Sequence, residues 1–169
     1  MNTDPIPLID LDLVEPGCNC PRFDPARWDK LRLRFEDKLF VHARTRSILH
    51  IPLNMSAVFS YTAERIKAAG ADDRRCIILT DDQSSWHSDH FFAVTKEVPE
   101  LEHVRISGDF ITRVFEGPYR DAYIWVGEMR HDIEERGRTM GWLFFYYVTC
   151  PKCAERRGQN YVVAVGEVV

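Results

Sequence analysis

The chain has 169 residues, of which 45% are hydrophobic and 28% charged, and this composition predicts one folded domain and excludes a mostly disordered chain. Its 22 Lys and Arg residues stand against 26 Asp and Glu, a formal net charge of −4, so no basic surplus predicts binding to nucleic acid. No apolar run approaches the roughly 18 residues of a membrane span, and the first residues lack the pattern of a signal peptide. We therefore expect a cytoplasmic protein that contacts no membrane.

Residues 1–44 are predicted to form an arm that packs on the rest of the chain. Residues 1–16 hold four acidic residues, three prolines and no basic residue, which predicts an extended segment. Residues 31–35 alternate apolar and charged side chains, which predicts a short edge strand. Phe23 and Trp28 supply the apolar surface by which the arm would pack.

Residues 45–169 repeat one order of elements. The first unit is predicted to consist of a strand at 47–53, a helix at 56–69 and strands at 76–80 and 91–98. The second is predicted to consist of a strand at 105–115, a helix at 118–135 and strands at 142–148 and 161–168. Two such βαββ units would make an α+β fold, an antiparallel sheet with two helices on one face. We expect a cavity at the seam between the repeats or on the free face of the sheet.

Four of the five cysteines form two close pairs, Cys18-x-Cys20 and Cys150-x-x-Cys153. Such thiolates can converge on a tetrahedral zinc ion, and four protein ligands would leave no open position for catalysis, so we predict a structural zinc site. Buried thiols, a disulfide and a redox pair are the alternatives. The redox pair is disfavoured because residues 156–158 predict a turn, whereas a redox Cys-x-x-Cys opens a helix. No motif for an organic cofactor is present.

The stretch Val114-Phe-Glu-Gly-Pro-Tyr119, in which a strand runs through Gly-Pro-Tyr into a helix, resembles the GyrI-like ligand-binding family over about residues 45–169. The resemblance implies the duplicated βαββ fold. It also implies functions that range from drug-responsive regulation to hydrolysis of cyclopropane-bearing DNA-alkylating natural products. Residues 50–55 and 146–154 resemble a branch of small stand-alone proteins that are often labelled hydrolases.

One position departs from that family. Its multidrug pockets hold a buried Glu two residues before a Tyr on the strand after the second helix. Here the Tyr is Tyr147, but the Glu position holds Phe145. A pocket for organic cations is therefore not expected, and any acid of the site must come from elsewhere.

Two acidic residues lie in phase with aromatic residues of predicted strands. Glu116 shares a strand face with Phe110, and Asp89 is in phase with Phe91. If that face lines the cavity, the Glu116 carboxyl among aromatic side chains would have a raised pKa and could act as a general acid or base. Asp89 could also point into the cavity, so both are candidate catalytic residues. The alternatives are a Glu stabilised at a helix N-terminus and an Asp that bonds the backbone of a turn.

Aromatic side chains supply the candidate walls of the pocket. Tyr147 is a candidate catalytic phenol, and the candidate ligand-binding residues are Trp86, Tyr119, Phe110, Phe91 and Phe145. Packing in the core is the alternative for the tyrosines. His87 and His90 are predicted to be solvated loop residues, and Ser84 or Ser85 with His87 lacks the context of a catalytic triad.

These features predict a domain that binds an aromatic or apolar small molecule, and it would act either by sequestering that molecule or as a hydrolase. The resemblance implies, for the hydrolase, ring opening of a strained electrophile in resistance or detoxification. The alternative is a non-catalytic, zinc-stapled module that sequesters a ligand or contacts a protein partner. The sequence leaves monomer and homodimer both open.

Overall fold

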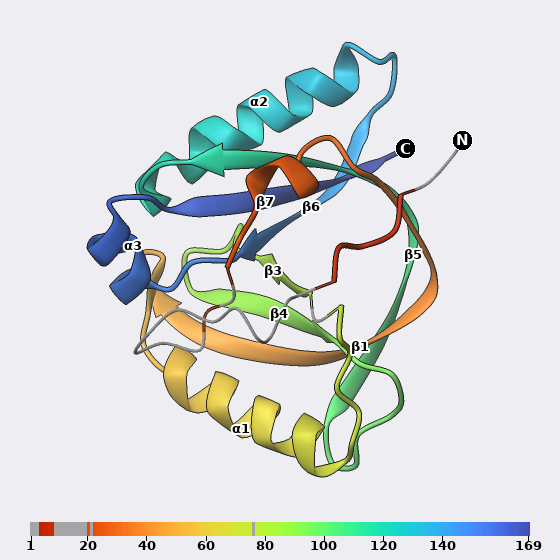
Figure 1. Cartoon of the computed structure of the whole chain (residues 1–169), viewed down its shortest axis with the longest axis vertical. Helices are drawn as coiled ribbons and strands as arrows, with labels where there is room; N and C mark the ends of the chain where they lie inside the picture. Colours follow the sequence, from red (N-terminus) through yellow and green to blue (C-terminus); the bar gives the residue numbers. More distant parts are fainter. Residues whose placement is uncertain (1–3, 9–19, 21, 76) are drawn as a thin grey trace. The chain divides into compact units, whose positions relative to one another are not determined.

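The computed structural model describes residues 4–8, 20, 22–75 and 77–169 (Figure 1). It divides into two compact units: unit 1 comprises the chain up to Arg34 together with Gly108–Val169, and unit 2 comprises Phe35–Ser107. The boundaries fall inside two long strands, β1 (Arg32–Ile48) and β5 (Glu102–Glu116), so the expected boundary at residue 44 lies within a strand. No helix in the described ranges is long and apolar enough to cross a membrane.

Unit 2 is an antiparallel sheet with a helix on one face. β1 is followed by β2 (Ile51–Pro52), α1 (Met55–Ala68), β3 (Ile78–Asp81) and β4 (His87–Ala93). β4 pairs with both β1 and β3, and β2 pairs with the end of β1. Figure 1 shows α1 alongside β1 and β4. The core under α1 joins Ile66 of the helix to Val41 and Phe92 of the two strands.

Unit 1 is also an antiparallel sheet with a helix packed on one face. β5 leads through a short 3-10 helix, η2 (Tyr119–Asp121), into α2 (Ala122–Glu134), which is followed by β6 (Met140–Tyr147), α3 (Pro151–Arg157) and β7 (Tyr161–Val168). β7 pairs antiparallel with both β5 and β6. Trp125, Met129 and Ile133 form the buried stripe of α2, as their helical spacing predicts, and they pack on the sheet. The expected mixed α+β class with antiparallel strands is therefore confirmed.

The N-terminal segment packs within unit 1. A short 3-10 helix, η1 (Pro25–Arg27), precedes Trp28, whose side chain is only 6% exposed. The Trp28 ring lies 5.2 Å from that of Tyr146, and the Thr112 hydroxyl donates to the Trp28 carbonyl. The backbone of Lys30 and Leu31 then bonds that of Thr112, at 3.0 Å in both directions. Aromatic packing and backbone pairing thus hold this part of the arm along β5.

Three elements differ from the prediction. β1 runs for 17 residues and joins the predicted strand at residues 31–35 to the start of the predicted strand at 47–53. The alternation of apolar and polar side chains in residues 41–46 is the strand pattern that the prediction left out. β4 begins at His87, so His87 and His90 lie on a strand and not in a loop. α1 begins at Met55 after Asn54, so Ser56 lies inside the helix.

The turn expected after Cys150 is a helix. Cys150 is the N-cap of α3, Pro151 occupies its first turn, and Gly158 ends it with a left-handed φ of 64°. Proline at the start and glycine at the end are the ordinary signals for a short helix. The prediction that a turn and not a helix follows Cys150 is therefore wrong. That prediction was the reason for disfavouring a redox pair, so this reason no longer applies.

Candidate functional site

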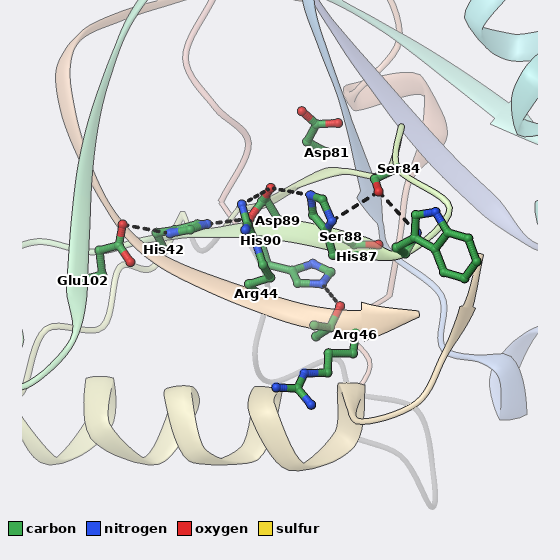
Figure 2. Close-up of polar contacts among 12 residues, drawn as sticks. His42, Arg44, Arg46, Asp81, Ser84, His87, Ser88, Asp89, His90 and Glu102 are labelled. Atoms are coloured by element: carbon green, nitrogen blue, oxygen red, sulfur yellow. Dashed lines mark hydrogen bonds and ion pairs between the residues drawn. The ribbon is translucent and has the colours of Figure 1, made fainter. Parts of the chain in front are cut away.

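The face of the unit 2 sheet that points away from α1 carries a row of polar side chains. The strand register places three pairs of residues directly opposite each other on β1 and β4: His42 with Phe91, Arg44 with Asp89, and Arg46 with His87. Since successive residues of a strand point to opposite faces, His42, Arg44, Asp89, His87 and Phe91 share this face, while Thr45 and His90 face α1. Figure 2 shows this polar network.

Asp89 lies at the centre of the network. Arg44 donates from Nε to Oδ1 at 2.8 Å and from Nη2 to Oδ2 at 3.1 Å, and His42 Nε2 lies 2.7 Å from Oδ1. Burial is the largest single influence and raises the Asp89 pKa, but the hydrogen bonds and charges of Arg44 and His42 together lower it below its ordinary value. The hydrogen bond to Asp89 also raises the pKa of Arg44. Asp89 is thus a fixed carboxylate at neutral pH, which cannot donate a proton.

His42 lies between two carboxylates. Its Nε2 faces Asp89, and its Nδ1 lies 3.2 Å from Glu102 Oε1. The contact between His42 Nδ1 and Glu102 Oε1 is within ion-pair distance but is not a hydrogen bond, because Nδ1 has no hydrogen-bond partner among the described residues. The ring stacks on Phe91, with 5.3 Å between centroids and 23° between planes. Phe91 therefore holds the ring that orients Asp89.

His87 lies at the end of the network farthest from Glu102 (Figure 2). Its Nδ1 is 3.2 Å from Ser84 Oγ, and its Nε2 is 3.8 Å from Asp89 Oδ2. Ser84 Oγ also accepts the Trp86 backbone N–H at 3.2 Å. The side chain of His87 is 40% exposed and Trp86 is 64% exposed, so a solute can reach both. The structure therefore brings Ser84 and His87 together, while the expectation that they do not make a catalytic triad stays a prediction.

A second serine and histidine meet in the same loop region. Ser85 Oγ lies 3.2 Å from His50 Nε2, and the His50 backbone N–H donates to the Ser85 carbonyl. Neither residue forms an ion pair with a carboxylate in the described part of the chain. The pair of His50 and Ser85 is thus a natural control for the pair of His87 and Ser84, which Asp89 extends.

His90 faces the other side of the sheet and is fully buried. Its ring nitrogens bond the hydroxyls of Thr45 at 2.8 Å and Thr80 at 3.0 Å, and Phe59 of α1 packs edge-on at 4.8 Å. Burial lowers the His90 pKa from 6.5 to about 4. His90 is therefore a neutral core histidine at neutral pH.

The predicted aromatic residues of unit 1 lie on two different faces of its sheet. Phe145 belongs to the core under α2, and Tyr147 packs against it and edge-on against Tyr119 at 5.6 Å. The Tyr119 hydroxyl donates to the Thr149 carbonyl, and burial is the main cause of its raised pKa. These contacts are those of core and turn residues, which was the alternative for the tyrosines.

Glu116 and Phe110 lie on the opposite face, in phase with each other as the alternation predicts. Phe110 is fully buried and packs against Phe144 at 6.3 Å. Glu116 is exposed at the end of β5, directly before the Gly117 turn. Unit 1 therefore does not bring Glu116 together with Tyr147, because the two side chains leave the sheet on different faces.

A cavity of about 510 Å³ in unit 1 contains none of the predicted aromatic wall residues. Its lining is largely charged and includes Lys30, Arg32, Arg136 and Glu135. Arg113, also in the lining, forms ion pairs with Glu128 and Asp132. This cavity does not have the apolar character that the sequence predicted for a ligand site.

Three cysteines of unit 1 converge. The Sγ atoms of Cys20, Cys150 and Cys153 all lie within 4.8 Å of one another. Cys153 is 1% exposed, and the other two are half-buried. The three are therefore close enough to hold a metal ion. The fourth predicted ligand, Cys18, lies outside the described residues.

Sequence reasoning missed much of the polar network. His42, Arg44 and Glu102 were not singled out, although His42, Arg44 and Arg46 recur with the period of two that marks one face of a strand. That period was the available signal. Their pairing with Asp89 depends on strand register, which no local pattern specifies.

The described fold and site define a mixed α+β protein with a polar network on one sheet face, and the comparisons give its family. The family model described as bacterial hydrolase matches residues 9–168. The chain belongs to this family. The search of curated proteins finds no match.

Solved structures share the fold at low identity. A hydrolase from Listeria innocua is 11% identical, with 84% of this chain and 92% of that chain covered and a TM-score of 0.57. An uncharacterized conserved protein from Listeria innocua is also 11% identical, with 84% and 93% covered and a TM-score of 0.60. EcmrR, solved in a complex with DNA, is 13% identical, with 83% of this chain and 57% of EcmrR covered and a TM-score of 0.56. At such identities the likeness concerns the fold alone.

Proposed function

We propose that the protein is a hydrolase of a small organic molecule and that His87 and Asp89 activate the attacking water. One observation carries the proposal: a half-exposed imidazole lies between the Ser84 hydroxyl and a carboxylate held ionised by two other side chains. The hydrolase family supports the class of reaction.

In the proposed reaction, His87 takes a proton from water as the oxygen attacks an electrophilic carbon. Asp89 stabilises the imidazolium that forms, because its pKa is held low and it stays ionised. The imidazolium then returns the proton to the leaving group, so that atoms and charge balance. Ser84 orients the ring, and the present distance of 3.8 Å to Asp89 must shorten in the reactive complex, as often happens in empty active sites.

For the substrate, we propose an aromatic or apolar molecule whose flat part lies against the exposed Trp86 indole. The resemblance to GyrI-like proteins suggests a cyclopropane-bearing alkylating compound. In that case water adds to a ring carbon, the ring C–C bond breaks, and its electron pair passes to a conjugated carbonyl that His87 protonates. We propose that this reaction serves resistance or detoxification in the cytoplasm. We also propose that the two units are βαββ repeats of each other.

The test uses p-nitrophenyl acetate and a cyclopropane-bearing DNA-alkylating compound as probes, with H87Q as the variant and H50Q as its control. His50 also bonds a serine but has no carboxylate behind it. Loss of a general base costs on the order of 10²–10⁴-fold, so we expect that loss of kcat/KM in H87Q and wild-type values in H50Q. Equal turnover by both variants, or no turnover of either probe by the wild type, would contradict the proposal.

A second function is favoured by the cysteine cluster: a non-catalytic module, stapled by zinc, that sequesters a ligand or contacts a partner. One measurement distinguishes this module from the proposed hydrolase. A sequestering protein binds the cyclopropane-bearing compound in equilibrium dialysis and releases it unchanged, whereas the hydrolase releases a product that is heavier by one water.

A further inference from the structure

The cysteine cluster of unit 1 is built from two distant parts of the chain. Cys20 belongs to the N-terminal segment, while Cys150 and Cys153 belong to the start of α3. The helix explains the second half of the cluster: Cys150 is the N-cap and Cys153 lies in the first turn, so one turn of backbone brings both thiols to the same side. Pro151 fixes the backbone between them.

The geometry points to a zinc ion bound through the thiolates of Cys20, Cys150 and Cys153. Zn–S bonds of about 2.3 Å in a tetrahedral site place sulfur atoms about 3.8 Å apart. The three Sγ atoms lie within 4.8 Å of one another, so small rotations about the side-chain bonds complete the arrangement. The inference is independent of the proposed hydrolase activity.

The donor set selects the class of metal. Among the described residues the cluster offers three sulfur donors and no carboxylate or imidazole, which favours a soft or borderline ion, whereas magnesium and calcium require oxygen ligands. Lys152, Arg156 and Arg157 of α3 supply positive charge close in sequence to the thiolates, which offsets the negative charge of a zinc–thiolate centre. A fourth ligand completes a tetrahedral zinc site, and water fills that position where the protein supplies three ligands.

The site would position more than the cysteines. Thr149, next to Cys150, accepts the Tyr119 hydroxyl bond through its carbonyl, and Tyr119 packs on Tyr147. On the other side of α3, Asn160 donates to the Gly117 carbonyl at 2.8 Å and accepts the Gly117 N–H at 3.0 Å through its own carbonyl. A metal at the start of α3 would therefore hold the Gly117–Tyr119 turn in place through contacts on both flanks of the helix.

The experiment measures metal on the full chain, purified under reducing conditions without a chelator. Mass spectrometry of the elements should find about one zinc per chain. Replacement by cobalt(II) should give the sulfur-to-cobalt charge-transfer absorption of a tetrahedral thiolate site. C20S and C153S should lose most of the zinc, whereas C76S, which removes the cysteine outside the two pairs, should keep it.

Three results would overturn the inference. The first is a wild-type chain that contains no zinc and does not bind cobalt(II) through sulfur. The second is a wild-type chain that contains iron or copper in place of zinc. The third is a zinc content in C20S and C153S equal to that of the wild type. Cys153 is buried, so C153S can fail to fold, but Cys20 is half-buried and outside any helix or strand. C20S and the cobalt spectrum of the unaltered chain therefore test the inference on folded protein.

Discussion

The middle strands of the two units occupy the same place in their sheets and have opposite chemistry. β7 lies between β5 and β6, and its residues Val162–Val165 are completely buried. β4 lies between β1 and β3 in the same antiparallel pattern, yet it begins with His87, Ser88, Asp89 and His90. Burying polar side chains on a middle strand lowers the free energy of unfolding unless they have hydrogen-bond partners. The polar side chains of β4 therefore depend on their network of partners. The same strand order thus carries an apolar middle strand in unit 1 and a polar one in unit 2, and the proposed chemistry is assigned to unit 2.

The largest expected effect concerns the apolar side of the comparison. Trp28 fills the unit 1 face opposite α2 against Tyr146, so W28A should lower the free energy of unfolding by about 3–5 kcal/mol. The control W142A, at a residue 56% exposed, should cost less than about 1 kcal/mol. Urea unfolding measures both. Similar losses for the two variants would show that Trp28 is not part of the core.

The next effect concerns His90, on the polar strand. The pKa of His90 falls from 6.5 in the unfolded chain to about 4 in the folded chain. Between pH 6.5 and 4, the His90 imidazole is therefore protonated in the unfolded chain and neutral in the folded one. The stability linked to His90 is therefore complete above pH 6.5 and declines by about 3 kcal/mol as the pH falls to 4.

Urea unfolding at a series of pH values measures that loss. H90Q should reduce the slope of unfolding free energy against pH in this window by about one proton. H131Q, at an exposed histidine of α2, is the matched variant with which the H90Q slope is compared. An unchanged slope in H90Q would mean that His90 does not titrate as its burial predicts.

A smaller effect tests how closely β7 and α2 pack. A methyl group at Gly166 would lie 2.9 Å from Met129 Cε and 3.0 Å from Ile133 Cδ1, so G166A should destabilise the protein by about 1–3 kcal/mol. G127A adds the same methyl group on α2 with no atom within 4 Å and should stabilise by about 0.5–1 kcal/mol. Thermal unfolding gives the sign of each change, and a stable G166A would show a loose interface.

The sequence was sufficient for the parts that local patterns specify. The stripe of Trp125, Met129 and Ile133 predicted α2 and its buried face, and the alternation around Phe110 predicted which residues share its strand face. The two cysteine pairs predicted a convergence that three of the four residues show. In each case the spacing along the chain fixes the geometry.

The rest depended on pairing between distant segments. Asp89 was chosen for its phase with Phe91, but the partners that lower its pKa come from β1, more than forty positions earlier in the chain. Glu116 and Tyr147 were grouped as one site, and only the sheet shows that they leave it on opposite faces.

The most direct test of the account compares one acid from each unit. Asp89 belongs to the polar network of unit 2, and Glu116 is the exposed acid of unit 1. With p-nitrophenyl acetate and the cyclopropane-bearing compound as probes, D89N should lose on the order of 10²-fold or more in kcat/KM while E116Q keeps wild-type turnover, with unfolding curves to confirm that both variants fold. Full turnover by D89N, or loss by E116Q alone, would contradict the assignment of the chemistry to unit 2.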